Sequence, residues 1–248
     1  MNEIIDLLNF NTLKQDSSVQ DDPLYWNQSD IVYNDTANVE GYVAHGAAID
    51  EINVWLKRHQ IKKGAKVIEL GCGGGRMLMN FDACNKKYGW NLELSAIDYS
   101  SKAIDVAKKH VPNCNFICGD MSESLSGSYD IFYSHTAIQH NSHRKSEKII
   151  KRIHELIRSD GLFWMKSEDT IASWSHKKMI GFTSFDETKH PFAHNTGGTG
   201  GTAAWWVVFV ARFGFELLEY IGVTSDKING AADAQCGFMP SSYTWKKI

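Results

Sequence analysis

Apolar and polar residues alternate along the chain in blocks that predict a repeated strand–helix order. Short apolar runs typical of buried strands lie at 65–70, 92–97, 114–118, 129–135 and 161–166. Apolar residues at helical spacing predict intervening helices at 43–59, 75–88, 101–110 and 142–158. We expect Gly161 to stop the last of these helices. Such repeats favour a parallel sheet with helices on both faces, in which ligands bind at the carboxyl ends of the strands.

The segments outside this repeat predict an arm, an insertion and a closing pair of strands. Residues 1–42 are polar and aromatic, which predicts an N-terminal arm or lid on a domain at 43–248. From about 168 to 204 a long polar and aromatic insertion follows, of a length that is usually functional or disordered. A buried helix and two final strands, the last antiparallel, are predicted at 203–214, 215–223 and 241–248.

Composition and charge narrow the class of protein. The 248 residues, 43% of them hydrophobic, suffice for one large α/β core. A net charge of -3 and a pI near 6.4 give no general attraction for nucleic acid or an anionic membrane. The N-terminus lacks the features of a secretory signal, no segment is long enough to span a bilayer, and five cysteines without a Cys-x-x-Cys pair fit free thiols. These features predict a soluble cytoplasmic protein.

The segment KVIELGCGGGR carries the clearest chemistry. Its glycines, among them Gly71, Gly73 and Gly75, allow the backbone to bend closely under a ligand. A dinucleotide site would need another glycine where Arg76 stands, and a buried acid such as Glu69 needs a ligand or a backbone partner. Both features disfavour a nicotinamide cofactor.

At residues 69–75 the sequence resembles the first motif of the class I S-adenosylmethionine-dependent methyltransferases, an acid and a hydrophobic residue before Gly-x-Gly-x-Gly. The match continues in order over roughly 43–166, and the segment ARFGFELLEY shows a weaker resemblance. The resemblance implies an α/β, Rossmann-like fold with a mostly parallel seven-stranded sheet and an antiparallel last strand. It also implies S-adenosylmethionine as cofactor and S-adenosylhomocysteine as product.

The resemblance implies a set of cofactor contacts along the carboxyl edge. Asp98 would accept hydrogen bonds from the ribose hydroxyls beside Tyr99, Asp120 would read the adenine edge, and Glu69 would support the amino group of the cofactor. The alternatives are a solvated acid for Asp98 and a helix cap for Asp120. The full expected set is Glu69, Gly71, Gly73, Gly75, Arg76, Asp98, Tyr99, Asp120, Met121, Ser134, Tyr25 and Trp26.

His135 and His140 follow the fourth predicted strand and are the catalytic candidates. A histidine is suited to remove a proton from an oxygen or nitrogen acceptor near neutral pH. A packed or backbone-bonded histidine is the equally open alternative. Expected substrate contacts come from the arm and the insertion, namely Tyr33, Glu168, Trp174 and His194. We expect no metal, because Pro191 makes a helix carrying His190 and His194 improbable.

The predicted function is transfer of a methyl group to an oxygen, less often a nitrogen, of a small molecule such as a sugar or secondary metabolite. The tetrapeptide SHTA stands after the fourth strand, where an NPPY-like sequence would indicate amino methylation. Two alternatives stay open, an RNA methyltransferase and a non-catalytic S-adenosylmethionine-binding partner subunit. We expect a monomer or homodimer that takes a small-molecule acceptor and does not bind membranes or nucleic acid.

Overall fold

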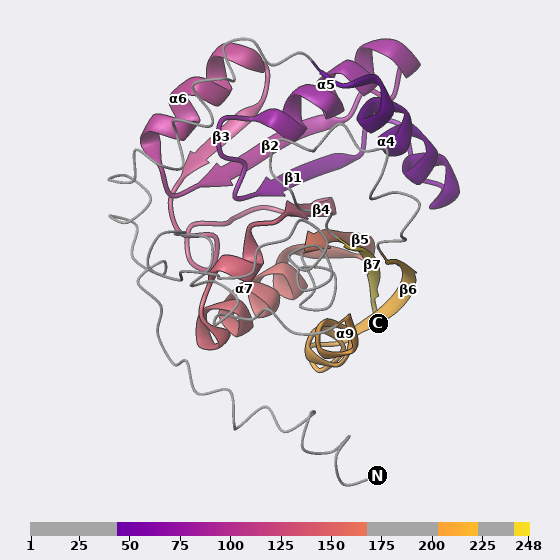
Figure 1. Cartoon of the computed structure of the whole chain (residues 1–248), viewed down its shortest axis with the longest axis vertical. Coiled ribbons are helices and arrows are strands. Elements are labelled where there is room, and N and C mark those ends of the chain that lie inside the picture. Colours follow the sequence, from indigo (N-terminus) through magenta and orange to yellow (C-terminus); the bar gives the residue numbers. More distant parts are fainter. Residues whose placement is uncertain (1–43, 168–202, 223–240) are drawn as a thin grey trace, which may run out of the picture.

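The computed structural model describes residues 44–167, 203–222 and 241–248, which form a sheet between two layers of helices (Figure 1). The sheet has seven strands in the order β3-β2-β1-β4-β5-β7-β6. Their bounds are β1 Lys66–Leu70, β2 Glu93–Asp98, β3 Asn115–Cys118, β4 Tyr129–His135, β5 Ile157–Ser167, β6 Phe215–Ile221 and β7 Ser241–Lys247.

Strands β1 to β5 pair in parallel, whereas β7 runs antiparallel to both β5 and β6. The predicted α/β class, the seven strands and the antiparallel last strand are therefore confirmed. The strand order reverses between β1 and β4, so the carboxyl ends of these two strands flank the switch point where ligands bind in such sheets.

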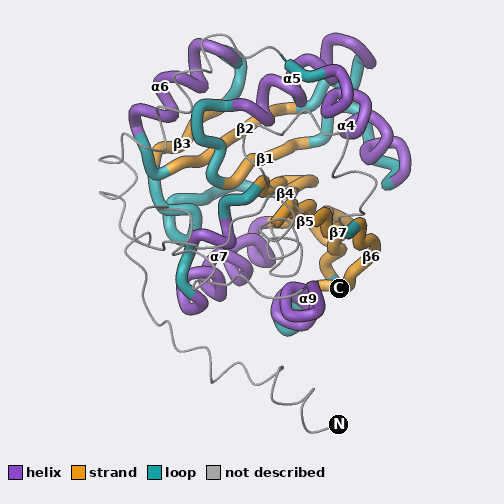
Figure 2. Tube along the Cα trace, viewed as in Figure 1, coloured by secondary structure: helices purple, strands orange, loops and turns teal. Residues whose placement is uncertain are grey.

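Helices cover both faces of the sheet, as Figure 2 shows most clearly. Helices α4, α5 and α6 lie on one face, and α7 and α9 lie on the other. Their bounds, with that of a short 3-10 helix before α7, are α4 Gly46–Arg58, α5 Arg76–Tyr88, α6 Ser101–His110, η3 Ile138–His140, α7 His143–Leu156 and α9 Ala203–Ala211.

Alternation along the strands divides the core into two layers. Val67 of β1 and Trp164 of β5 pack among α4, α5 and α6. Their neighbours Ile68 and Phe163 pack against α7 and α9 instead. Both layers need apolar side chains, so these strands appear in the sequence as continuous apolar runs rather than alternating ones.

One predicted boundary is wrong. Helix α7 ends at Leu156, and Gly161 lies inside β5 instead of ending the helix. A Cβ at Gly161 would lie 2.6 Å from Cγ1 of Ile157 and 3.0 Å from the carbonyl oxygen of Asp130. The pairing register of β4 and β5 shifts at this point, so the glycine serves an irregular, crowded part of the sheet.

No helix in the described ranges has the length and apolar character needed to cross a membrane.

Candidate functional site

The glycine turn between β1 and α5 brings bare backbone to the carboxyl edge of the sheet. Gly71, Gly73 and Gly75 have φ angles of 67°, 51° and 87°, which favour glycine. A Cβ on Gly71 would collide with that of Ala137, and one on Gly75 would lie 3.0 Å from that of Ala107. No atom of the described residues would lie within 4 Å of a Cβ on Gly73. Two glycines are thus required by packing, while Gly73 faces open space that a ligand can approach.

Glu69 is a buried acid, with 2% of its surface exposed, at the end of β1. One side of its carboxyl group accepts a hydrogen bond from the backbone of Leu78, and Oε2 has no hydrogen-bond partner among the described residues. Burial raises the pKa of Glu69 well above its usual value, although the nearby Arg76 guanidinium opposes the rise. A cationic ligand group would satisfy Oε2, which is the fit expected for the amino group of S-adenosylmethionine.

Asp98 ends β2 directly beside the glycine turn. Its Oδ2 accepts a hydrogen bond from Gly73 N at 2.8 Å, and its Oδ1 accepts one from Ser100 N at 2.9 Å. Burial raises the pKa of Asp98, while backbone hydrogen bonds from Ser100, Gly73 and Tyr99 oppose the rise. A carboxylate offers about four acceptor positions, so these donors leave capacity for a ribose hydroxyl. The ribose contact itself stays a prediction.

Asp120 lies in the turn after β3, close to Tyr99. Its Oδ1 accepts hydrogen bonds from Ser122 N at 2.6 Å and Ser122 Oγ at 2.7 Å. Its Oδ2 forms an ion pair with Lys145 Nζ, which lies 5.5 Å from the centre of the Tyr99 ring. Met121 is buried beside them. Asp120 therefore stabilises its own turn, which does not begin a helix, and its adenine contact stays a prediction.

The end of β4 carries a strained backbone. Ser134 is fully buried, and its Oγ has no hydrogen-bond partner in the described part of the chain. His135 follows at the edge, and Thr136 then adopts a φ of 52°. A β-branched residue rarely occupies this region, and such strain costs on the order of 1–3 kcal/mol and concentrates at functional sites. Thr136 Oγ1 lies 3.4 Å from Nδ1 of His135, so the strained residue also contacts the predicted base.

The two candidate histidines differ in their surroundings. Burial lowers the pKa of His135 well below its usual value, and Lys166 and Arg76 lower it further. Burial also lowers the pKa of His140, to about 4, while a hydrogen bond to the backbone of Thr136 opposes the shift. Both rings are therefore neutral at neutral pH. Both rings also hydrogen-bond backbone, His135 its own and His140 that of Thr136, so the position of His135 at the end of β4 is what makes it the better candidate for contact with an acceptor.

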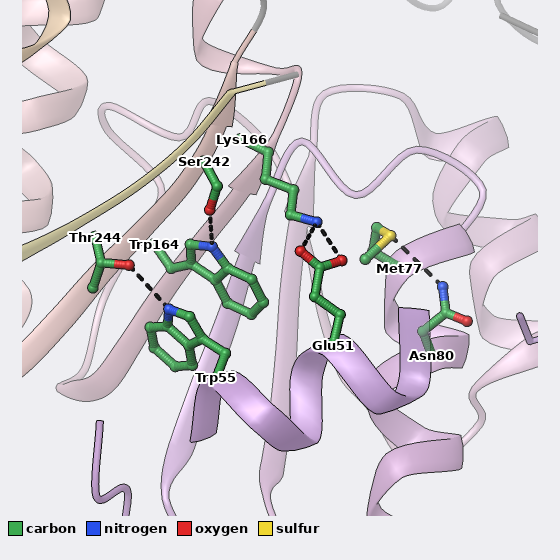
Figure 3. Close-up of polar contacts among 8 residues, drawn as sticks. All are labelled: Glu51, Trp55, Met77, Asn80, Trp164, Lys166, Ser242 and Thr244. Carbon is green, nitrogen blue, oxygen red and sulfur yellow. Dashed lines mark hydrogen bonds and ion pairs between the residues drawn. The ribbon is translucent and has the colours of Figure 1, made fainter. Parts of the chain in front are cut away.

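A second polar group, the Lys166–Glu51 ion pair, lies beside His135 at the ends of β4 and β5, which is the predicted acceptor side of the edge. Lys166 is in register with His135 on the neighbouring strand β5, and its Nζ lies 2.6 and 2.7 Å from the two carboxylate oxygens of Glu51 on α4. Figure 3 shows this ion pair beside the stacked rings of Trp55 and Trp164, whose centroids are 4.3 Å apart. The pair holds α4 over the end of β5 and places a cation near the candidate base.

The pair of tryptophans is anchored from the last strand. Trp55 Nε1 donates to Thr244 Oγ1 at 2.9 Å, and Trp164 Nε1 donates to Ser242 Oγ at 2.8 Å (Figure 3). Both hydroxyls belong to β7, so this strand positions α4 and the end of β5 together. Buried side-chain hydrogen bonds of the core therefore hold α4, the end of β5 and β7 together.

Several predicted site residues lie outside the described residues and stay predictions. They are Tyr25, Trp26, Tyr33, Glu168, Trp174 and His194. The remaining predicted residues all come from the carboxyl ends of β1, β2 and β4, the turn after β3, the glycine turn, the first residue of α5 and the segment after β4. Within the described ranges, no three His, Cys, Asp or Glu side chains cluster closely enough to hold a metal ion.

Sequence reasoning missed Lys145, Thr136, Lys166 and Glu51. One signal was available for Lys145, because it stands in the first turn of a helix, where the helix dipole favours acids over bases. No local pattern indicates the positive φ of Thr136 or the pairing of Lys166 with Glu51, which is 115 positions away.

A hollow of about 640 Å³ lies at the opposite edge of the sheet, lined by residues such as Lys66, Glu93 and Asn115 at the amino ends of the strands. The exposed polar residues around it, with the Lys66–Glu93 ion pair, are well solvated. It shares none of the buried acids of the carboxyl edge and is not the candidate site.

Comparison with known proteins identifies the family. The model of a family described as a methyltransferase domain matches residues 61–203, more than half of the chain. This chain belongs to that family. The expected resemblance to class I S-adenosylmethionine-dependent methyltransferases is thereby confirmed, while the assignment of the glycine turn to their first motif stays a prediction.

Similar methyltransferase-family proteins include enzymes of different chemistry. Carboxy-S-adenosyl-L-methionine synthase of Nautilia profundicola is 33% identical over 138 residues, which cover 49% of this chain and 56% of the relative. Malonyl-[acyl-carrier protein] O-methyltransferase of Bacillus anthracis is 26% identical over 140 residues, covering 55% and 48% respectively. The chain thus spans about half the length of these relatives.

The fold extends over a complete solved methyltransferase. The plantazolicin methyltransferase BpumL, crystallised with S-adenosylhomocysteine and a pentazolic desmethyl analogue, superposes with a TM-score of 0.63 at 14% identity. The match covers 100% of this chain and 99% of that one. At this identity the likeness shows the shared fold.

Proposed function

We propose that this methyltransferase-family protein transfers a methyl group from S-adenosylmethionine to an oxygen atom of a small molecule. The observation that carries the proposal is the arrangement at the carboxyl edge. The open face of Gly73, the unpartnered Oε2 of Glu69 and the carboxylate of Asp98 lie together there. These groups suit, respectively, a close backbone approach, a cationic amino group and a ribose hydroxyl.

The cofactor supplies an electrophilic methyl group on a positively charged sulfur when it is bound. The chain contributes alignment and proton removal. Glu69 and Asp98 would fix the two ends of the cofactor, so that the methyl group faces His135 at the end of β4. In the proposed reaction the methyl group would move from the cofactor sulfur to the acceptor oxygen, the hydroxyl proton would pass to His135, and S-adenosylhomocysteine would be released.

The surroundings of His135 suit a base that is ready at neutral pH. Because its pKa is lowered, the ring stays neutral at neutral pH and has a free lone pair that can accept a proton. The positive charges of Lys166 and Arg76 both lower that pKa. An acceptor that brings negative charge would offset them and raise the pKa of His135, so the base would become stronger only when substrate is present. A base here suits an acceptor whose proton must be removed, and oxygen is favoured over nitrogen because one similar protein is itself named an O-methyltransferase.

Binding and turnover test the proposal separately. Calorimetry with S-adenosylhomocysteine should detect one site per chain, and a panel of hydroxylated small molecules should contain an acceptor that takes up a labelled methyl group. His135→Asn should keep the cofactor affinity and lower kcat about 100-fold or more, since general-base catalysis typically contributes 10²–10⁴-fold. His110→Asn, at the far end of α6, is the matched control and should keep full turnover. An unchanged kcat in His135→Asn would remove the histidine from the mechanism, and absence of cofactor binding would remove the proposal.

A further inference from the structure

Lys145 is a nearly buried cation in a position where helices disfavour one. It lies in the first turn of α7, where its backbone N–H donates to the capping hydroxyl of Ser142 at 3.2 Å. The helix dipole favours acidic residues here, yet none is present in this turn. The side chain is only 12% exposed and turns back to the sheet edge. A partner must compensate this unfavourable placement.

That partner is Asp120, whose hydrogen-bonding capacity is almost filled. Its Oδ1 accepts two hydrogen bonds from Ser122, at 2.6 and 2.7 Å. Its Oδ2 pairs with Lys145 Nζ, and the carboxylate is itself only 16% exposed. Of about four acceptor positions on a carboxylate, one is left, and it is on the oxygen that Lys145 holds. The lysine therefore sets the direction of the last free acceptor position of Asp120.

Lys145 also contacts Tyr99, the other residue that is predicted to lie beside adenine. Its Nζ lies 5.5 Å from the centre of the Tyr99 ring, within reach of a cation–π interaction. Tyr99 follows Asp98 directly, and Asp98 O accepts a hydrogen bond from Gly119 N at 2.9 Å. One side chain from α7 thus joins the segments after β2 and β3, which are the two segments predicted to surround adenine.

We propose that Lys145 is a positioning residue for base recognition, which fixes Asp120 as an ionised acceptor for the 6-amino group of adenine. The inference rests on the proposed placement of the cofactor. A purine with an amino group at position 6 donates to the remaining lone pair of Asp120, whereas a 6-oxo purine presents an oxygen that the ionised acid repels. Without the lysine, Asp120 can rotate and then tolerate either base.

The experiment compares two ligands, S-adenosylhomocysteine and S-inosylhomocysteine, by calorimetry. Wild-type protein should prefer the amino ligand by about 10- to 100-fold, as expected for one hydrogen bond to a charged group. In Lys145→Met this preference should fall at least about fivefold toward equality, and in Asp120→Asn it should fall similarly. The double variant should lose little more than either single one, since the two residues act as a unit.

Two further variants keep the test decisive. Lys148→Met removes an exposed lysine one turn along the same helix and should leave both affinities unchanged. Lys145→Arg keeps the charge and should retain most of the preference. An undiminished preference in Lys145→Met, or tighter binding of both ligands, would overturn the inference. Failure of wild-type protein to bind S-adenosylhomocysteine would instead overturn the proposed function.

Discussion

The two halves of the carboxyl edge are built in different ways. On the predicted nucleoside side, at the ends of β1 and β2, the acids are held by nearby backbone, as when Gly73 and Ser100 donate to Asp98. On the acceptor side, at the ends of β4 and β5, the groups are set by distant partners. Lys166 pairs with Glu51, 115 positions away, and its neighbour Ser167 donates to Gln139 Oε1 at 2.7 Å.

This difference suits two predicted tasks, cofactor binding on one side and acceptor binding on the other. Backbone hydrogen bonds do not depend on side-chain identity, so Asp98 can keep its position when the side chains around it change. The predicted acceptor side depends instead on side chains from α4, β5 and β7. Variants on the nucleoside side should therefore change cofactor affinity, and those on the acceptor side should change turnover.

The largest effect is expected on the nucleoside side, from Asp98→Ala. The variant loses the ribose acceptor and the bond that tethers Gly73, so affinity for S-adenosylhomocysteine should fall about 100-fold or more. Asp105→Ala removes an acid that is 73% exposed on α6 and should bind as wild type does. Calorimetry gives both affinities, and a thermal melt checks that the variants are folded. Equal affinities for the Asp98 variant and wild type would contradict the assignment of this residue.

Two glycines of the same turn should separate folding from binding. Gly71→Ala drives a Cβ into Ala137 at a positive φ, and we expect it to lower the free energy of unfolding by about 3 kcal/mol. Gly73→Ala has room within the protein, so it should cost only about 1 kcal/mol of stability.

The main effect of Gly73→Ala should appear in cofactor binding, where the added methyl group occupies the space of the ligand. Denaturant unfolding and calorimetry on both variants measure the two effects. A Gly73 variant with wild-type affinity would show that the cofactor does not approach this backbone.

A smaller effect is expected from the ionisation of Glu69. The raised pKa means that the folded protein holds a proton on this group at a pH where the unfolded chain has lost it. The stabilising contribution of that proton is fully present below the usual Glu pKa and is lost as pH rises through the folded pKa. A cationic amino group next to Oε2 should reverse the shift and expel the proton.

Calorimetry of S-adenosylhomocysteine in buffers of different ionisation enthalpy measures the protons released. Wild type should release a fraction of a proton, up to one, at this site. Glu69→Gln should release fewer and bind about tenfold more weakly, because one charged hydrogen bond is lost. If the binding enthalpies of wild type do not depend on the buffer, Glu69 does not meet the amino group.

The same contrast explains what the sequence could predict. The order of strands and helices follows from apolar periodicity, and the range 129–135 matches β4 residue for residue. The acids of the nucleoside side stand at fixed places after strands, so a short motif locates Asp98 and Asp120. The carboxyl edge was therefore predicted from local pattern, and the structure brings these residues together.

What local pattern could not predict depends on tertiary contacts. Gly161 looks like a helix stop in sequence, yet it is needed in β5 because Ile157 and the Asp130 carbonyl leave no room for a side chain. Lys166 belongs to an apolar run, and only the fold brings it to Glu51 and His135. The positive φ of Thr136 is imposed by its surroundings against its own preference.

The smallest effect should come from relaxing this strained residue on the acceptor side. Thr136 is held by a hydrogen bond from its N–H to the Lys166 carbonyl at 2.8 Å, and its own backbone accepts from His140. Thr136→Gly removes the clash that a β-branched side chain suffers at φ 52°, which should raise the free energy of unfolding by up to about 1 kcal/mol after the entropy cost of glycine. Turnover should fall severalfold, since His135 loses its rigid neighbour, while cofactor affinity should not change.

Thr136→Ala is the matched control for the backbone effect. It removes the hydroxyl that lies 3.4 Å from His135 but keeps a Cβ at the positive φ, so it should gain no stability. Denaturant unfolding, calorimetry and turnover on both variants separate strain from side-chain contact. If glycine destabilises the protein as much as alanine does, the backbone at this position is not strained. If both variants weaken cofactor binding, the two halves of the edge are coupled and the division of tasks between them fails.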